Sequence, residues 1–295
     1  MSEINMDALL PPEMATRAES IGVRKAGMGT FQTFALAVLA GAFIALGAIF
    51  STTVAAGSTA ISAPDGSAAF TAALPFGVIR ILAGLAFCLG LILVVVGGAE
   101  LFTGNNLIAI AWASGKVSTA KLLRNWTIVY LGNFVGSLGT AVLMLLSRQY
   151  LFGKGAIGVA ALNTAVAKVN YDFLQAIALG ILCNGLVCLA VWMSYSARST
   201  LDRIAAIIFP ITAFVAAGFE HSVANMYFVP YGLLVKAFDP AFITEVGARV
   251  PGLESLTWSS FFMNNLLPVT IGNIIGGTLL VAVIYWSVYL RSKGN

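Results

Sequence analysis

Charged side chains are scarce in this chain. Asp, Glu, Lys and Arg together make up 9% of its 295 residues, whereas hydrophobic residues make up 59%. A soluble domain carries about 25% charged residues. The mean hydropathy of +0.92 agrees with this scarcity. We therefore predict an all-α integral membrane protein that has the lipid bilayer as its solvent. The net charge of +4 comes with no basic stripe, which excludes nucleic acid as a partner.

Histidine and cysteine are also rare, with one histidine and three cysteines in the whole chain. Cys88, Cys183 and Cys188 all lie in apolar runs, and their odd number provides no disulfide framework. The chain lacks an H-E-x-x-H motif, a G-x-S-x-G motif and any Cys/His cluster with metal-ligand spacing. One histidine without a partner base or nucleophile does not make a catalytic site. The sequence thus predicts no metal site, no cofactor and no enzymatic activity.

The N-terminus lacks the pattern of a secretory signal, because residues 1–12 are polar and acidic. Residues 11–28 predict an amphipathic helix, since Pro11 and Pro12 suit a helix start. Four apolar residues fall near one face of that helix, namely Met14, Ala18, Ile21 and Met28. We assign residues 1–29 to a cytoplasmic N-terminal part that lies against the membrane, caps a pore mouth or forms a plain surface helix.

Six apolar segments can be compared with the ~20 residues that a helix needs to cross a bilayer. They cover residues 31–56, 77–112, 125–147, 172–194, 204–236 and 262–290. These segments predict a transmembrane channel domain over 30–291 and a cytoplasmic tail at 292–295. An even number of spans places both termini on one side of the membrane. That side carries ten Lys and Arg residues and the opposite side carries six, which identifies the side of the termini as the cytoplasm. The predicted location is a bacterial inner membrane.

The second and fifth segments are too long for one crossing, and the same motif interrupts both. Gly98–Asn105 and Gly218–Asn225 read G-x-E-x-x-x-x-N and lie 120 residues apart. The third and sixth segments share G-N-x-x-G, at Gly132–Gly136 and Gly272–Gly276. Three spans in each half force the halves into opposite orientations. The sequence therefore predicts a 3+3 inverted repeat in which the second and fifth helices are broken.

A helix break at membrane depth frees backbone groups that must face protein or an aqueous cavity. The ionisable residues deep in the apolar segments are Glu100, Glu220 and His221, and such residues are costly in a bilayer. His221 matches Leu101 in the repeat, so we favour a pore-facing role over a neutral core histidine. The two glutamates match each other, which favours a structural role in capping free backbone amides. Thr103 is the second candidate for contact with the solute.

Asparagines and large apolar residues flank the two breaks. The asparagines are Asn105, Asn133, Asn225 and Asn273. We expect their side chains to support the broken backbone rather than to contact solute. The apolar residues are Phe87, Leu91, Phe102 and Phe214. They form either ordinary core packing or two hydrophobic constrictions around His221, which would exclude hydrated ions by dewetting.

Several long motifs resemble the formate/nitrite transporter family. They are E-L-F-T-G-N at 100–105, G-F-E-H-S-V-A-N-M at 218–226 and P-V-T-I-G-N-I-I-G-G at 268–277. Leu189–Arg198 is similar to the formate-channel branch of that family, and the resemblance extends from about Leu10 to Arg291. It implies an aquaporin-like protomer that holds its own pore and assembles as a homopentamer, with a central hole that does not conduct the substrate.

The resemblance also implies roles for single residues. His221 matches the central histidine, Thr103 matches the threonine of the first break, and the four apolar residues named above match the constrictions. The remaining matches are a vestibule lysine at Lys168, a fourth-helix asparagine at Asn184, and supports of the histidine region at Glu220 and Asn273. The Gly/Ala/Ser-rich loop at 57–73 is the expected departure in length.

The predicted function is bidirectional transport of formate and related small monovalent weak-acid anions. Lys168 and the half-helix dipoles gather the anion, and His221 donates a hydrogen bond or a proton that helps it across a dry constriction. Transport is then pH-gated or proton-coupled. Three alternatives stay open: a nitrite channel of the same family, a neutral-solute pore, although no N-P-A triplet exists, and a scaffold whose N-terminal helix binds a cytoplasmic formate-producing enzyme.

Overall fold

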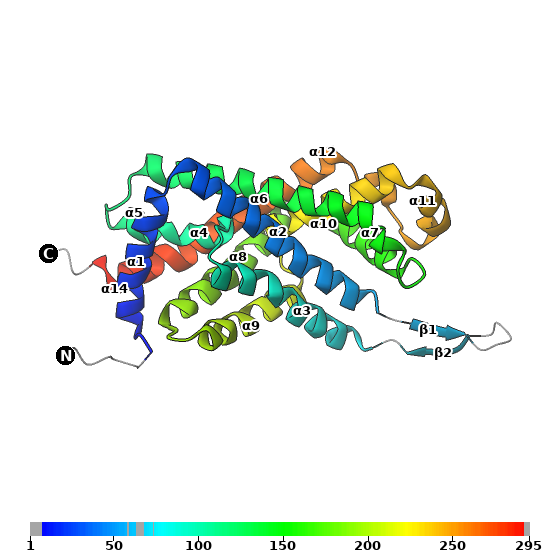
Figure 1. Cartoon of the computed structure of the whole chain (residues 1–295), viewed down its shortest axis with the longest axis horizontal. Coiled ribbons are helices and arrows are strands. Elements are labelled where there is room, and N and C mark those ends of the chain that lie inside the picture. Colours follow the sequence, from blue (N-terminus) through cyan, green and yellow to red (C-terminus); the bar gives the residue numbers. More distant parts are fainter. Residues whose placement is uncertain (1–7, 58, 63–67, 73, 292–295) are drawn as a thin grey trace.

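Six helical stretches in the described part of the chain are long and apolar enough to cross a membrane. The computed structural model describes residues 8–57, 59–62, 68–72 and 74–291. The six stretches are α2 (Thr30–Ala55), α3 (Phe76–Gly97), α6 (Thr119–Ser147), α8 (Phe173–Ser196), α9 (Thr200–Ala217) and Trp258–Tyr289. They form one elongated bundle (Figure 1). Many of their large apolar side chains are exposed, as lipid or neighbouring subunits require.

Four non-helical residues interrupt each of the two overlong segments. Helix α3 ends at Gly97, and α4 (Phe102–Asn105), η1 (Asn106–Ile108) and α5 (Ala109–Ala113) follow the first break at 98–101. Helix α9 ends at Ala217, and α10 (Ser222–Phe238) follows the second break at 218–221. The chain leaves each helix through a left-handed residue, Gly98 with φ 78° and Gly218 with φ 81°. Only glycine adopts this conformation without a steric penalty, which explains the first letter of the repeated motif.

The last span is not uniformly α-helical. It consists of α12 (Trp258–Ser260), the π-helical η5 (Phe261–Leu266), α13 (Leu267–Ile274), the π-helical η6 (Ile275–Val283) and α14 (Ile284–Tyr289). Pro268 lies in the first turn of α13, directly after a π-helical turn. Proline cannot donate the usual helical hydrogen bond, and a wide turn before it accommodates the missing donor.

Shorter elements gather at the end of the bundle opposite α1 and α14 (Figure 1). These are η2 (Gln149–Leu151), α7 (Ala156–Val169), α11 (Pro240–Val246), η3 (Gly247–Arg249) and η4 (Leu253–Ser255). Strands β1 (Thr59–Ser62) and β2 (Ala68–Ala72) form an antiparallel hairpin that projects from the end opposite α1 and α14 (Figure 1). This hairpin lies in the 57–73 loop, where the all-α prediction placed no strand.

Helix α1 (Pro11–Gly27) packs on the protein at one end of the bundle, next to α5, η1 and α8. Met14 and Ala18 on its apolar face are buried, as the amphipathic pattern predicts. Glu19 forms an ion pair of 2.5 Å with Lys116. The Arg17 guanidinium donates to the Tyr195 carbonyl at 2.9 Å. Helix α1 therefore lies across the end of the bundle, where it lines a cavity described below.

Close approach of helix backbones depends on the repeated glycines. A Cβ atom added to Gly136 would collide with the Val38 carbonyl of α2, and one added to Gly276 would collide with the Ile181 carbonyl of α8. The two contacts are equivalent in the two halves of the chain. The G-N-x-x-G motif therefore lets α6 pack on α2, and the last span pack on α8, at backbone contact distance.

Replacing Gly136 with alanine is expected to destabilise the protein by about 1–3 kcal/mol, because the new methyl group meets a main-chain carbonyl that cannot move aside. Gly139→Ala, on the same helix, is the matched control, since nothing lies within 4 Å of a Cβ at that position. Thermal unfolding of the detergent-solubilised protein measures both. Equal melting temperatures for the two variants would contradict the backbone-contact role.

Candidate functional site

The first break holds a buried carboxylate whose side-chain partners among the described residues are a lysine and an asparagine. The Glu100 carboxylate pairs with Lys25 Nζ at 2.8 Å and accepts from Asn105 Nδ2 at 2.7 Å. Asn105 also bonds Asn125 Oδ1 at 2.9 Å and accepts from Lys25 Nζ at 2.9 Å. Helix α1 thus supplies the cation for a carboxylate on the break between α3 and α4.

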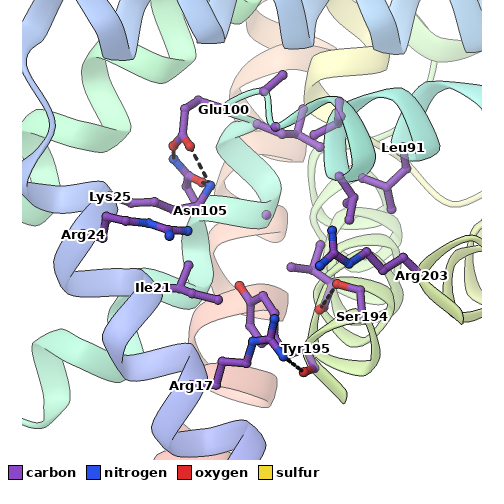
Figure 2. Close-up of a pocket in the computed structure, with 17 residues that line it drawn as sticks. Arg17, Ile21, Arg24, Lys25, Leu91, Glu100, Asn105, Ser194, Tyr195 and Arg203 are labelled. Carbon is purple, nitrogen blue, oxygen red and sulfur yellow. Dashed lines mark hydrogen bonds and ion pairs between the residues drawn. The ribbon is translucent and has the colours of Figure 1, made fainter. Parts of the chain in front are cut away.

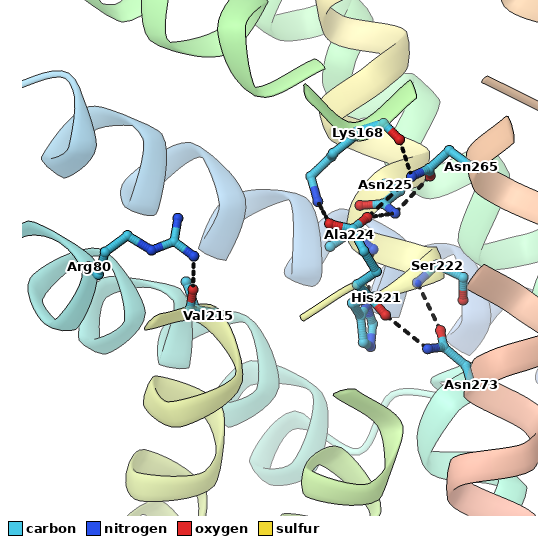
Figure 3. Close-up of polar contacts among 10 residues, drawn as sticks. Arg80, Lys168, Val215, His221, Ser222, Ala224, Asn225, Asn265 and Asn273 are labelled. Atoms are coloured by element: carbon cyan, nitrogen blue, oxygen red, sulfur yellow. Dashed lines mark hydrogen bonds and ion pairs between the residues drawn. The ribbon is translucent and has the colours of Figure 1, made fainter. Parts of the chain in front are cut away.

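The second break repeats this arrangement (Figure 3). The Glu220 carboxylate pairs with Lys168 Nζ at 2.8 Å and accepts from Asn225 Nδ2 at 2.7 Å. Asn225 also bonds Asn265 Oδ1 at 2.8 Å, and Asn265 Nδ2 donates to the Lys168 carbonyl at 2.8 Å. Here the cation comes from α7, which takes the place that α1 has in the other half.

The two glutamates were expected to cap backbone amides, and this expectation is wrong. Their side chains bind Lys and Asn side chains instead, because a carboxylate at membrane depth needs a cation nearby. Sequence analysis also missed Lys25, Asn125 and Asn265. The signal was present, since Lys25 and Lys168 are 143 residues apart and Asn125 and Asn265 are 140 apart. These matches are found only if the number of residues between equivalent positions is allowed to differ from one pair of equivalent spans to the next.

The asparagines of the two G-N-x-x-G motifs form hydrogen bonds with backbone N–H and C=O groups at the breaks. Asn133 Oδ1 accepts from the Phe102 amide at 2.9 Å, and its Nδ2 donates to the Glu100 carbonyl at 2.9 Å. Asn273 Oδ1 accepts from the Ser222 amide at 2.9 Å, and its Nδ2 donates to the Glu220 carbonyl at 2.9 Å. Both side chains bond the broken backbone, are fully buried and line neither of the two cavities described below.

His221 and Thr103 meet where the two breaks face each other. Nε2 of His221 lies 2.9 Å from the Thr103 hydroxyl. Nδ1 accepts from the Ala224 amide at 3.0 Å, so the histidine is also the N-cap of α10. An Nδ1 atom that accepts from a backbone amide carries no hydrogen, so the ring is neutral with its hydrogen on Nε2. The ring therefore donates toward Thr103.

Two cavities approach this pair from opposite sides. The first, which we call the α1 cavity, has a volume of about 230 Å³ and is lined by residues of α1, of α3 and of the first break, Leu91 and Glu100 among them (Figure 2). The second, the α7 cavity, has about 210 Å³ and is lined by Lys168, Glu220 and His221. Thr103 and Asn184 line neither of these two cavities.

Apolar side chains separate the cavities. Phe87 and Phe214 both line the α7 cavity, and their rings meet edge to face at 5.5 Å. The Phe214 ring also stacks near His221, with centroids 5.9 Å apart. Leu91 lines the α1 cavity one helical turn further along α3. These three residues stand where a hydrophobic constriction is predicted.

Phe102 lies elsewhere. Its ring packs edge to face on Tyr130 at 4.9 Å and on Trp126 at 6.2 Å, both on α6, and it lines neither cavity. The sequence places Phe102 next to the break but does not show which way its ring turns, because that direction depends on packing against a helix about 25 residues later.

Asn184 links the halves instead of lining a cavity. Its Nδ2 donates to Asn106 Oδ1 and to the Asn273 carbonyl, both at 2.7 Å, and the side chain is fully buried. Both of its amide hydrogens are used. Gly277 makes room for this amide, since a Cβ there would meet Asn184 Nδ2.

Arg80 is a further residue of the α7 cavity that the sequence did not single out. Its Nε donates to the Ala216 carbonyl at 3.0 Å and its Nη2 to the Val215 carbonyl at 2.5 Å, so it binds the C-terminal end of α9 (Figure 3). Among the described residues it has no carboxylate within ion-pair distance. Nor does that part of the chain hold a group of three His, Cys, Asp or Glu residues able to bind a metal.

Comparisons with known proteins agree with this architecture. The family model described as formate/nitrite transporter matches residues 12–287. Formate channel FocA of Escherichia coli strain K12 is 46% identical over 290 residues, which cover 98% of this chain and 97% of that protein. Formate channel FocA of Haemophilus influenzae is 40% identical over 277 residues, covering 94% and 93%. A solved pentameric formate channel with formate bound superimposes with a TM-score of 0.79 at 44% identity, covering 89% and 98%.

The shared sequence motifs, the six apolar helices and the two breaks lead to one conclusion. This chain is a multi-pass membrane protein, and it belongs to the formate/nitrite transporter family.

Proposed function

We propose that this protein is a transmembrane channel for formate and related small weak-acid anions, and not an enzyme. The observation that carries the proposal is the His221–Thr103 hydrogen bond, buried between two cavities and next to an apolar constriction. A hydrogen-bond donor at that point replaces part of the water that a carboxylate loses. The names of the relatives, formate channels of 40% and 46% identity, support formate as the substrate.

The geometry favours hydrogen-bond donation by His221 over proton donation. A neutral ring offers Nε2–H, which turns from Thr103 to a carboxylate oxygen without breaking the cap on Ala224. The carboxylate then takes a proton from hydronium in the cavity, giving water and the neutral acid, which crosses the constriction more cheaply than the anion. Protonation of the ring would instead place a hydrogen on Nδ1, where it would face the N–H hydrogen of Ala224. This conflict makes His221 our candidate for the pH dependence of transport.

Flux measurements in proteoliposomes test the proposal. Formate uptake should be saturable and should carry one proton with each anion, measured with an internal pH dye. Nitrite is the second substrate to assay, because the family description includes it. Glycerol and water permeation measured by light scattering are the controls. Fast glycerol flux with no formate flux would replace the proposal with a neutral-solute pore.

Arg80 is expected to concentrate anions in the α7 cavity. The Lys168 charge is matched by Glu220, which leaves Arg80 as the cation of that lining without a described carboxylate partner. Arg80→Gln should raise the half-saturating formate concentration by about tenfold at low ionic strength and by less at high salt. Arg80→Lys keeps the charge and should restore uptake. An equal defect in both variants would show that Arg80 acts only on the end of α9.

The assembly and orientation follow from the same proposal. We place both termini in the cytoplasm and the protein in a bacterial inner membrane, on the Lys/Arg bias of ten against six. The relative described as a pentameric formate channel supports a homopentamer. The outer face of α1 is our predicted contact for a cytoplasmic formate-producing enzyme. Native mass spectrometry tests the pentamer, and flux compared with enzyme binding after deletion of residues 1–28 tests the contact.

A further inference from the structure

The α1 cavity has an excess of positive charge that the transport of a monovalent anion does not explain. Its lining contains Arg17, Arg24 and Lys25 from α1 and Arg203 from α9, with Glu100 as the carboxylate. Figure 2 shows the α1 side chains facing Arg203 across the cavity. The α7 cavity, in contrast, has Arg80 and Lys168 against Glu220. The two halves are built alike at the breaks but differ in charge at their mouths.

Three of the four cations have no ion-pair partner among the described residues. Lys25 is paired with Glu100 at 2.8 Å. Arg17, Arg24 and Arg203 have no carboxylate within ion-pair distance in the described part of the chain. Arg17 uses Nη1 on the Tyr195 carbonyl, which leaves its Nη2 hydrogens for another acceptor. Three guanidinium groups around one small cavity repel each other unless an anion lies between them.

We propose that the α1 cavity binds a small phosphate-bearing polyanion. A guanidinium fork matches phosphate oxygens in pairs, and three forks from two helices match an ion with two or more negative charges. Tyr195, which also lines the cavity, adds a hydroxyl group, whereas the Ser194 hydroxyl already donates to the Val191 carbonyl at 2.6 Å. The volume of about 230 Å³ corresponds to roughly eight water molecules at about 30 Å³ each, enough for inorganic pyrophosphate.

A bound polyanion cannot continue through the protein. Leu91 and the Phe87–Phe214 pair close the inner end of the path, and an ion with several charges cannot shed its water there. Such an ion therefore blocks the mouth next to α1. This blocking role rests on the proposed transport function, whereas binding itself does not.

Calorimetric titration of pyrophosphate into the full-length protein in neutral detergent tests binding directly. We expect saturable binding that weakens by about tenfold or more in Arg24→Gln/Arg203→Gln. The matched control is Lys121→Gln/Arg291→Gln, which removes two exposed cations at the same end of the protein but outside the cavity lining. Absence of saturable binding to the wild type, or an equal loss in the control pair, would overturn the proposal.

Flux assays separate blocking from binding and free phosphate from lipid. In phosphatidylcholine vesicles, pyrophosphate should inhibit formate flux when added on the side of α1 and have at least tenfold less effect from the side of α7. In vesicles that contain phosphatidylglycerol, arginine-dependent inhibition without pyrophosphate would identify a lipid headgroup as the source of the phosphate. Binding without side-specific inhibition would refute the blocking role. Absence of formate flux would refute the transport function and leave the calorimetric result standing.

Discussion

Replacing His221 with phenylalanine should lower formate flux by about 10- to 100-fold, the range expected when a buried anion loses one hydrogen-bond donor. Phenylalanine fills the space of the ring but cannot donate to the anion at the Thr103 position. It also leaves the Ala224 amide without its acceptor, which costs about 1–3 kcal/mol of stability. The remaining flux should lose the part of its pH dependence that comes from the ring, because no group titrates at that point, and keep only the dependence on hydronium concentration. Proteoliposome uptake between pH 5 and 8 measures both effects.

Asparagine at position 221 separates the two roles of the histidine. Its side-chain oxygen is a good N-cap and can accept from the Ala224 amide, so the melting temperature should stay close to that of the wild type. Its amide hydrogens can still bind a carboxylate, so flux at neutral pH should stay within about tenfold of the wild type. The part of the pH dependence that comes from the ring should disappear, since asparagine does not titrate. A His221→Phe protein with wild-type flux and an unchanged pH profile would refute the role of His221.

Replacing Lys168 with methionine should destabilise the protein by about 3–5 kcal/mol, because it leaves the Glu220 carboxylate buried without its cation. The exposed fraction of the Glu220 side chain is 2%, so water cannot replace the ammonium group. Thermal and denaturant unfolding of the detergent-solubilised protein measure the change. The double variant Lys168→Met/Glu220→Gln should recover most of the loss, because the neutral amide still accepts from Asn225.

Lys25→Met is the matched comparison in the other half. It breaks the equivalent pair, but the Lys25 side chain is 22% exposed against 13% for Lys168, and the Glu100 side chain is 6% exposed against 2% for Glu220. We expect a smaller loss of stability, since water can reach the unpaired carboxylate. Equal losses at the two sites would show that cavity water does not solvate Glu100. A double variant less stable than Lys168→Met alone would refute the pairing argument for Glu220.

Several features of the fold were predicted correctly from local patterns. Apolar runs at 31–56, 125–147 and 172–194 agree with α2, with most of α6 up to its C-terminal end, and with α8. The overlong second and fifth runs contain helix ends at Gly97 and Ala217. Such predictions succeed because helix length and left-handed glycine caps depend on residues close together in the chain.

The sequence pointed to several residues of the candidate site, but not to Lys25, Asn125 or Asn265 and not to the contacts among them. His221 and Thr103 are brought together, as the twin motif indicated, whereas Asn184 bonds Asn106 and Phe102 packs on Tyr130. Each of these contacts joins helices far apart in the sequence. Side-chain direction in such contacts depends on helix rotation and register, which local periodicity does not specify.

The sequence by itself determined that this is a membrane protein of two inverted halves, each with one broken helix and few ionisable groups at depth. Composition and motif spacing suffice for that, because lipid excludes charge and free backbone groups. Only the tertiary structure decided that Lys25 and Lys168 neutralise the two glutamates, and that three arginines face one cavity while one faces the other. Those pairings join residues 52 to 75 positions apart, and electrostatic energy depends on distance in space rather than along the chain.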